Sequence, residues 1–259
     1  MFRKRYYYLI ELQFLGFRYH GWQKQPDVIT VEHMVLRTLY YVLGHKNCKV
    51  LAAGRTDAMV SASQTYIELF VDETEIKVSD FLPLLNRNLP PDIRALSVVE
   101  VDKEFAIMNA PKEKEYRYYF SCGRKNHPFA APFITGIIEQ LDIESMQQAS
   151  RLFEGSHDFK NYAYRPTPTT QTQGTILKCD MIENKDFTAS FFPKKSYFLQ
   201  VVGRGFKRHQ IRLMMGALFD VGEGKLTIED IMKTLDSSES IKLERIAPAS
   251  GLMVHEVRM

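Results

Sequence analysis

The hydrophobic and polar positions of this chain follow two periods, which predict strands and helices. Residues 6–14 are rich in aromatic and branched apolar side chains, so this segment predicts a strand. In residues 31–43 the apolar side chains return every three or four positions, which is typical of a helix with one buried face. Thr30 stands just before the first apolar position and is a candidate N-cap for that helix.

The same periods continue along the chain and produce a repeated order of elements. The first half is expected to add strands at 49–53, 64–71 and 93–101 and a helix at 78–87. The second half is expected to hold strands at 116–121, 176–182, 197–202 and 253–257, with helices at 143–153, 209–221 and 228–235. Apart from the last of these helices, which is an addition, each half has the order β-α-β-β-α-β. The pattern therefore predicts an α+β protein of two ferredoxin-like halves, divided by the polar segment at 105–114 into domains at 1–108 and 109–259.

Composition narrows the class of protein and its compartment. The chain has 259 residues, of which 45% are hydrophobic, so it is not a disordered or collagen-like protein. Its cysteines Cys48, Cys122 and Cys179 lie far apart without a C-x-x-C spacing, which favours neither a disulfide framework nor a thiolate metal site. No segment reaches the ~18–20 uninterrupted apolar residues of a membrane span. We therefore expect a protein of the reducing cytoplasm, with no membrane contact and no metal.

Charge is distributed unevenly along the chain. The formal net charge is +3, but residues 160–212 hold ten Lys and Arg against three acidic residues, a net charge of +7, and the rest of the chain has −4. A second group of basic residues at 112–125 is interleaved with aromatic ones. Cations beside aromatic rings suit the phosphates and unpaired bases of RNA, although a solvated charged face would have the same composition. Charge alone leaves both interpretations open.

The segment Gly54-Arg55-Thr56-Asp57-Ala58 lies between two predicted strands. Its glycine permits a tight turn, and its threonine and aspartate can accept hydrogen bonds from nearby amides. Taken alone, the segment favours a structural turn over a catalytic site. Other motifs of the chain shift the interpretation toward a catalytic site. One stands before this segment and several follow it, in a recognisable order.

These motifs together resemble the TruA family of tRNA pseudouridine synthases. They are YHGWQKQP, GRTDA followed by VSA, a Y-R-Y after the polar segment, FKRHQIRLMMGAL with a following VG, and APASGL near the end. They stand in the family's order and extend from about Tyr8 to Val257. Each motif alone would be weak, but five in order are specific.

The resemblance implies an isomerase that converts uridine to pseudouridine in tRNA without a small-molecule cofactor. It also implies two ferredoxin-like halves that share a continuous, mainly antiparallel sheet with the active cleft between them. Members of the family act as homodimers on the anticodon stem-loop, at tRNA positions 38–40. The family's aspartate falls on Asp57, its active-site tyrosine on Tyr116, and the arginine that pairs with the aspartate on Arg212.

The chemistry explains why these residue types are needed. Cleavage of a glycosidic bond without water needs a carboxylate, and Asp57 is the expected nucleophile, although attack on the sugar, addition to the base or removal of a ribose proton all remain open. Tyr116 offers a ring to stack on uracil, and Arg55 is the candidate to hold the flipped nucleotide. Core packing for the tyrosine, a surface charge for Arg212 and a loop salt bridge for Arg55 are the structural alternatives.

The chain departs from the family pattern at three positions. Met59 replaces a glycine, Ser61 replaces a histidine, and Met108 stands where bacterial members carry an arginine. These changes concern RNA contacts more than chemistry. A catalytically silent RNA-binding or tRNA-folding factor is the alternative function, and a retaining glycosidase is disfavoured because no second acidic residue accompanies Asp57.

Overall fold

The structure is a computed structural model that describes residues 4–110, 112–236 and 243–259. Pro111, in the expected boundary segment, lies outside the described residues. The chain is a mixed α+β protein whose strands pair mainly antiparallel, which confirms the predicted class. By spatial contact it divides into two compact units, residues 1–112 with 254–259, and residues 113–253.

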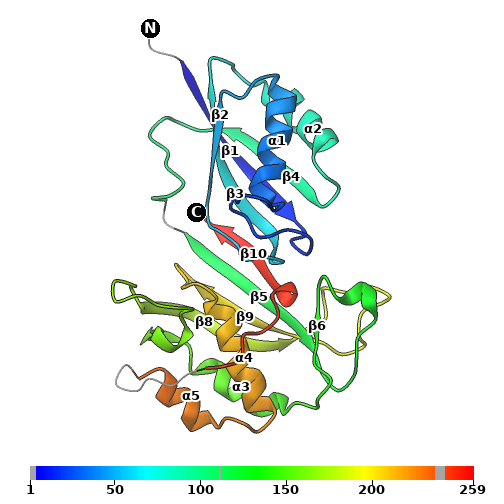
Figure 1. The fold of residues 1–259 in the computed structure, drawn as a ribbon, viewed down its shortest axis with the longest axis vertical. Coiled ribbons are helices and arrows are strands. Elements are labelled where there is room, and N and C mark those ends of the chain that lie inside the picture. Colours follow the sequence, from blue (N-terminus) through cyan, green and yellow to red (C-terminus); the bar gives the residue numbers. More distant parts are fainter. Residues whose placement is uncertain (1–3, 111, 237–242) are drawn as a thin grey trace. The chain divides into compact units, whose positions relative to one another are not determined.

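The first unit has the order β-α-β-β-α-β that the sequence predicts. Its elements are β1 (Arg5–Phe14), α1 (Val31–Leu43), β2 (Cys48–Ala52), β3 (Ser61–Asp72), α2 (Val78–Asn88) and β4 (Ile93–Glu100). The hydrogen-bonded order is β4-β1-β3, with β2 also paired to β3, and all of these pairs are antiparallel. Helices α1 and α2 lie side by side in this unit (Figure 1).

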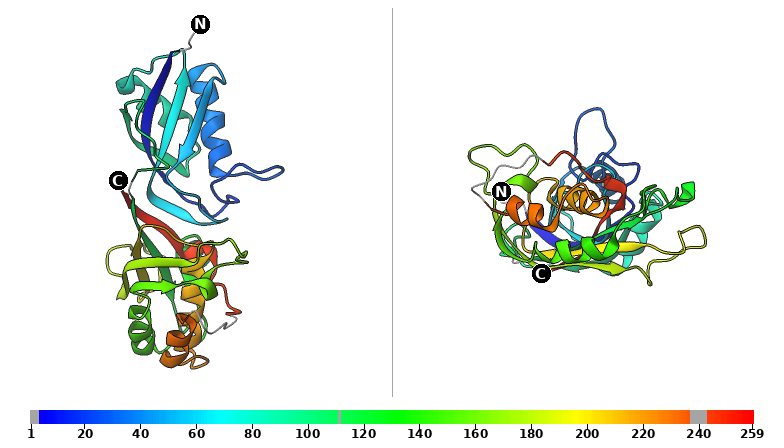
Figure 2. Two further views of the ribbon diagram at one scale, coloured as in Figure 1. Left: turned by 90° about the vertical axis from the view of Figure 1, so that its left-hand side faces the viewer. Right: turned by 90° about the horizontal axis from the view of Figure 1, so that it is seen from below.

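The alternation of β1 explains how this unit forms its core. Tyr8, Ile10, Leu12 and Phe14 are buried, and the residues between them are partly exposed. Helix α1 stands on one side of β1 and β3 (Figure 2, left), and its buried stripe includes Val31, Val35 and Leu39. Thr30 is the N-cap of α1 as predicted, because its hydroxyl accepts a hydrogen bond from the backbone N–H of His33.

The second unit contains a sheet in the order β5-β9-β8-β7. Its elements are β5 (Glu113–Ser121), β6 (Thr135–Gly136), α3 (Ile143–Arg151), β7 (Gly155–Asp158), β8 (Gln173–Glu183), β9 (Tyr197–Gly203), α4 (Gln210–Gly222) and α5 (Ile228–Thr234). Short 3-10 helices lie at Pro128–Ala130, Lys160–Tyr162 and Ala249–Gly251. Helix α3 packs against both α4 and α5 (Figure 1). The pattern predicts every main element here, and among the described residues of this unit only β6, β7 and the 3-10 turns are additional.

The last strand, β10 (Leu252–Arg258), is divided between the units. The sequence pattern counts it with the second half, but residues 254–259 belong to the first compact unit, in which β10 lies beside β3. The amide of Val257 donates a hydrogen bond to Oε1 of Gln64 in β3. None of the helices in the part of the chain that the structure describes is long and apolar enough to cross a membrane.

Candidate functional site

The loop that carries Arg55 and Asp57 joins β2 to β3 in the first unit. Arg55 is exposed and Asp57 is half-buried. Two backbone hydrogen bonds join this loop to the loop after β1. The amide of Trp22 donates to the carbonyl of Thr56 at 3.2 Å, and the amide of Met59 donates to the carbonyl of Tyr19 at 2.9 Å. The aspartate therefore stands on a segment that is anchored on both sides to the loop after β1.

Two glycines of the loop after β1 allow this close contact. A Cβ at Gly21 would lie 2.5 Å from the carbonyl oxygen of Thr56, and one at Gly16 would lie 1.9 Å from that of Val60. Gly21 also has φ +84, which L residues with side chains adopt rarely. Only residues without a side chain let the two loops approach to hydrogen-bonding distance, which is the physical reason for the glycine in the YHGWQ motif.

The departure at Ser61 has a structural role in this contact. Ser61 is buried at the start of β3, and its hydroxyl accepts a hydrogen bond of 2.9 Å from the amide of Gly16. Trp22 is buried and packs near the ring of Phe14, at 6.2 Å between centroids. The tryptophan therefore anchors the loop after β1.

A network of charged and polar side chains joins the loop after β1 to Asp92. The Asp92 carboxylate accepts hydrogen bonds from the Arg18 guanidinium and from the hydroxyl of Tyr19, the latter at 2.7 Å. Burial by itself raises the pKa of Asp92, but the bonds from Arg18 and Tyr19 outweigh it and lower the pKa below its usual value. Since the Tyr19 carbonyl holds Met59, this network supports the aspartate loop through the backbone of Tyr19.

Tyr116 lies in the second unit, on β5. It pairs in register with Val201 of β9 and is half-buried. Its ring meets Phe206 edge to face, with centroids 5.1 Å apart and planes at 77°. Phe206 belongs to the segment between β9 and α4, so it positions the Tyr116 ring from the same connection that leads to Arg212.

Arg212 is in the first turn of α4 and is half-buried. Its Nε donates to the carbonyl of Ala247 at 2.9 Å, and the amide of Ala247 donates back to the carbonyl of Arg212 at 3.0 Å. The segment with Ala247 passes very close to α4, because a Cβ at Gly216 would lie 2.0 Å from the carbonyl oxygen of Arg245. The backbone of the APASGL motif thus holds this arginine in place.

The structure places the four predicted site residues in two pairs. Arg55 and Asp57 share one loop of the first unit, and Tyr116 and Arg212 lie in the second unit. That all four act at one site stays a prediction.

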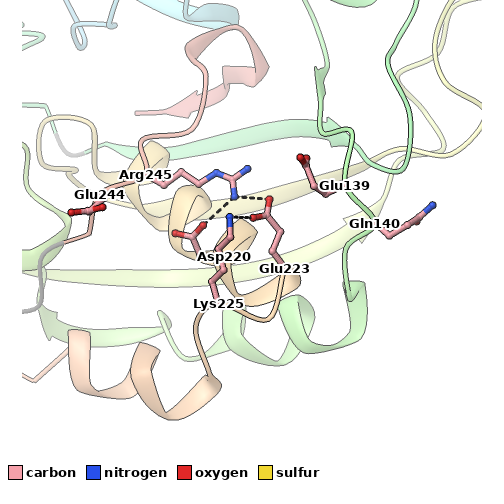
Figure 3. Close-up of a pocket in the computed structure, with 7 residues that line it drawn as sticks. All are labelled: Glu139, Gln140, Asp220, Glu223, Lys225, Glu244 and Arg245. Carbon is pink, nitrogen blue, oxygen red and sulfur yellow. Dashed lines mark hydrogen bonds and ion pairs between the residues drawn. The ribbon is translucent and has the colours of Figure 1, made fainter.

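A pocket of about 700 Å³ in the second unit contains none of these four residues (Figure 3). Its lining is Glu139, Gln140, Asp220, Glu223, Lys225, Glu244 and Arg245. Arg245 Nη1 bonds to Asp220 at 3.0 Å and Glu223 at 2.7 Å, and Lys225 also contacts Glu223. Burial raises the pKa of Glu223, and the two cations lower it below its usual value. An acidic lining whose cations are already paired does not suit a phosphate-bearing ligand.

In the described ranges, no group of three or more His, Cys, Asp or Glu residues is placed to hold a metal ion.

Comparison with known proteins identifies the family of the chain. A family model described as tRNA pseudouridine synthase matches residues 149–258. The protein named tRNA pseudouridine synthase A 2 from Desulfotalea psychrophila is 31% identical over 265 residues, which cover 98% of this chain and 98% of the relative. The chain belongs to the tRNA pseudouridine synthase A family. Two other members of the family, from a Geobacillus species and from Acetivibrio thermocellus, are 31% and 30% identical, and each match covers 95% of this chain.

Family membership confirms the resemblance based on the five motifs. The family model spans α4 with Arg212, and the full-length relatives also cover β5 and the aspartate loop. Sequence reasoning missed the contributions of Phe206, Ala247 and Asp92. Phe206 and Ala247 lie within quoted motifs, but their partners are distant along the chain, and Asp92 had no signal beyond its place after Pro90-Pro91.

Proposed function

We propose that this member of the tRNA pseudouridine synthase A family isomerises uridine to pseudouridine in tRNA, with Asp57 as the nucleophile. The observation that carries the proposal is the full-length match to the synthases together with the anchored loop that presents a half-buried Asp57. A nucleophile must be held in a defined position before the substrate arrives, and the backbone bonds to Trp22 and Tyr19 provide that order.

The reaction is balanced without an external reagent. The bond from uracil N1 to ribose C1′ breaks, the base turns, and a bond from C5 to C1′ forms. C5 loses its proton and N1 gains one, so substrate and product have the same composition. In this reaction Asp57 acts as the nucleophile while the N1–C1′ bond breaks, and its carboxylate is released unchanged once the C5–C1′ bond has formed. Tyr116 stacks on the released base, Arg212 pairs with the Asp57 carboxylate, and Arg55 holds the flipped nucleotide.

Three finer statements belong to the same proposal. The target uridine lies in the anticodon stem-loop, at tRNA positions 38–40, as the family resemblance implies. The enzyme acts as a homodimer. It works in the cytoplasm, where tRNA is processed and where Cys48, Cys122 and Cys179 would stay the free thiols that the structure contains.

The decisive experiment is release of tritium from tRNA labelled at C5 of uridine. Wild-type protein is expected to release tritium, and Asp57→Asn is expected to lower the rate about 10⁴-fold or more, because it removes the nucleophilic carboxylate. Asp102→Asn is a matched control, since Asp102 is an exposed carboxylate of the same unit, and it should leave the rate unchanged.

Two other outcomes would contradict the proposal. Tight tRNA binding without tritium release from any tRNA would favour a silent RNA-binding factor. Release that survives Asp57→Asn would show that another residue is the nucleophile.

A further inference from the structure

The ring of Tyr164, in the second unit, contacts two arginines that come from two separate segments. The guanidinium carbons of Arg165 and Arg208 each lie 5.2 Å from the centroid of the Tyr164 ring. The ring of His209 lies 4.5 Å from it, at an interplanar angle of 33°. The amide of Tyr164 donates to the carbonyl of Arg208 at 3.0 Å, so the two segments are joined through the backbone.

The backbone on both sides of this cluster adopts an uncommon conformation. Arg165 has φ 50 and His209 has φ 58, in the left-handed region that residues with a side chain seldom occupy. Such residues are strained, and they cluster at binding and active sites. These two turns bring Arg165 and Arg208 to the same aromatic ring.

The two arginines have N–H groups that are available to bind a ligand. Both are exposed, and neither forms an ion pair with a carboxylate within residues 4–110, 112–236 and 243–259. A guanidinium that stacks on a ring keeps its N–H edge available, and this edge matches the oxygens of a phosphate. Neighbouring Lys207 differs, because its ammonium donates to the carbonyl of Gln173 at 2.9 Å and burial lowers its pKa.

The position of the cluster points to RNA as the ligand. It lies within residues 160–212, the segment with a net charge of +7. Arg208 lies just before α4, and Arg212 lies four residues later in the first turn of that helix. A polyanion such as RNA contacts several cations of a basic segment at once, so its backbone is a source of phosphate that fits this cluster.

We propose that Tyr164, Arg165 and Arg208 form a phosphate clamp that binds the backbone of the substrate RNA outside the reacting nucleotide. Tyr164 holds the planes of the two guanidinium groups, and the guanidinium edges bind phosphate oxygens. This inference rests on the proposed function, because it assumes that RNA is the substrate.

The test measures the affinity for unmodified tRNA in the Asp57→Asn background over a series of salt concentrations. Arg165→Ala and Arg208→Ala are each expected to weaken binding about 5- to 20-fold. Each should also lower the slope of log affinity against log salt by about 0.7–0.9, the effect of one lost phosphate contact. Tyr164→Phe keeps the ring and should bind as the parent does, whereas Tyr164→Ala should lose affinity.

Arg151→Ala is the matched control for loss of one positive charge. Arg151 lies in α3 of the same unit, with its side chain 69% exposed and 3.7 Å from Asp180. It should change neither the affinity nor the slope. Thermal unfolding of each variant shows whether its fold is intact. Arg208→Lys is a second variant at this position, which keeps the positive charge but loses the planar guanidinium group.

The outcomes separate the clamp from the proposed function. If wild-type protein releases tritium from tRNA and the two arginine variants bind with unchanged affinity and slope, the clamp is wrong and the proposed function stands. If Arg151→Ala weakens binding as much as they do, only general charge is involved and the clamp is also wrong. If wild-type protein neither binds tRNA nor releases tritium, the proposed function is wrong, and the clamp, which rests on it, is wrong as well.

Discussion

Met59 lies two residues after the proposed nucleophile and has φ 67. The family pattern has a glycine at this position, and the left-handed conformation supplies the reason, since glycine adopts it without steric cost. The amide of Met59 donates to the carbonyl of Tyr19, so the surrounding loops hold the strained conformation. The departure from the family pattern therefore places a residue with a strained backbone in the aspartate loop.

Substitution at Met59 tests this interpretation. Met59→Gly should be more stable than Met59→Ala by about 1 kcal/mol, because both remove the side chain beyond Cβ and only glycine relieves the strain. Urea denaturation of the two variants measures the difference. Equal stability of both variants, or a more stable alanine variant, would contradict a strained residue 59.

At the residue scale, candidate site residues could be named from the sequence, but the contacts that support them could not. Asp57 and Tyr116 stand within motifs that resemble a family, and their roles stay predictions. The contacts of Gly16 with Val60 and of Gly21 with Thr56 join segments far apart in sequence, and no local pattern predicts such an approach.

At the scale of elements, Asp92 joins two parts of the first unit. It stands just before β4, and it binds Arg18 and Tyr19 from the connection between β1 and α1. The Asp92 backbone carbonyl also accepts a hydrogen bond from the amide of Leu15 at 2.9 Å. This arrangement predicts that the stability of the aspartate loop depends on the charge of Asp92.

Asp92→Asn should lower the free energy of unfolding by about 1–2 kcal/mol at pH 7, a value reduced because the Arg18 side chain is 53% exposed. The folded-state pKa of Asp92 lies below its ordinary value of 3.8. Its contribution is therefore complete above about pH 4 and is lost as the pH falls through the lower folded pKa. Urea denaturation between pH 3 and 7 should show the difference from wild type narrowing at the acid end. A constant difference, or one shared by Asp102→Asn, would refute this role.

The main helices and strands followed from local pattern, with ends shifted by only a few residues. Thr30 caps its helix as the sequence predicts, because capping depends on the next three residues alone. Asp142 caps α3 in the same way. The short strand β7 was missed, since Gly155–Asp158 has no apolar alternation and is defined by its pairing with β8.

For the whole molecule, the distribution of charge matters more than its total. The net charge of +3 includes the segment with +7, and that segment contains Arg165, Arg208 and Arg212. A weakly basic protein can thus present a strongly basic surface to a polyanion.

The proposed homodimer is tested by mass. Light scattering coupled to size-exclusion chromatography should give twice the 30.1 kDa of one chain at micromolar concentration. Dimers should persist in the Arg165→Ala variant, because the clamp is proposed to bind RNA and not a second copy. A mass of 30.1 kDa at all concentrations tested would contradict the dimer.

The sequence by itself determined the order of elements, the helix caps, the basic segment and the motifs that place Asp57, Tyr116 and Arg212. These features depend on residues that are close along the chain, where periodicity and side-chain chemistry are sufficient. Only the tertiary structure decided that Gly16 and Gly21 pack against the backbone of the aspartate loop and that Met59 is strained. It also decided that β10 lies beside β3 and that Arg165 and Arg208 both contact the ring of Tyr164. Those relations depend on long-range packing, which no local pattern encodes.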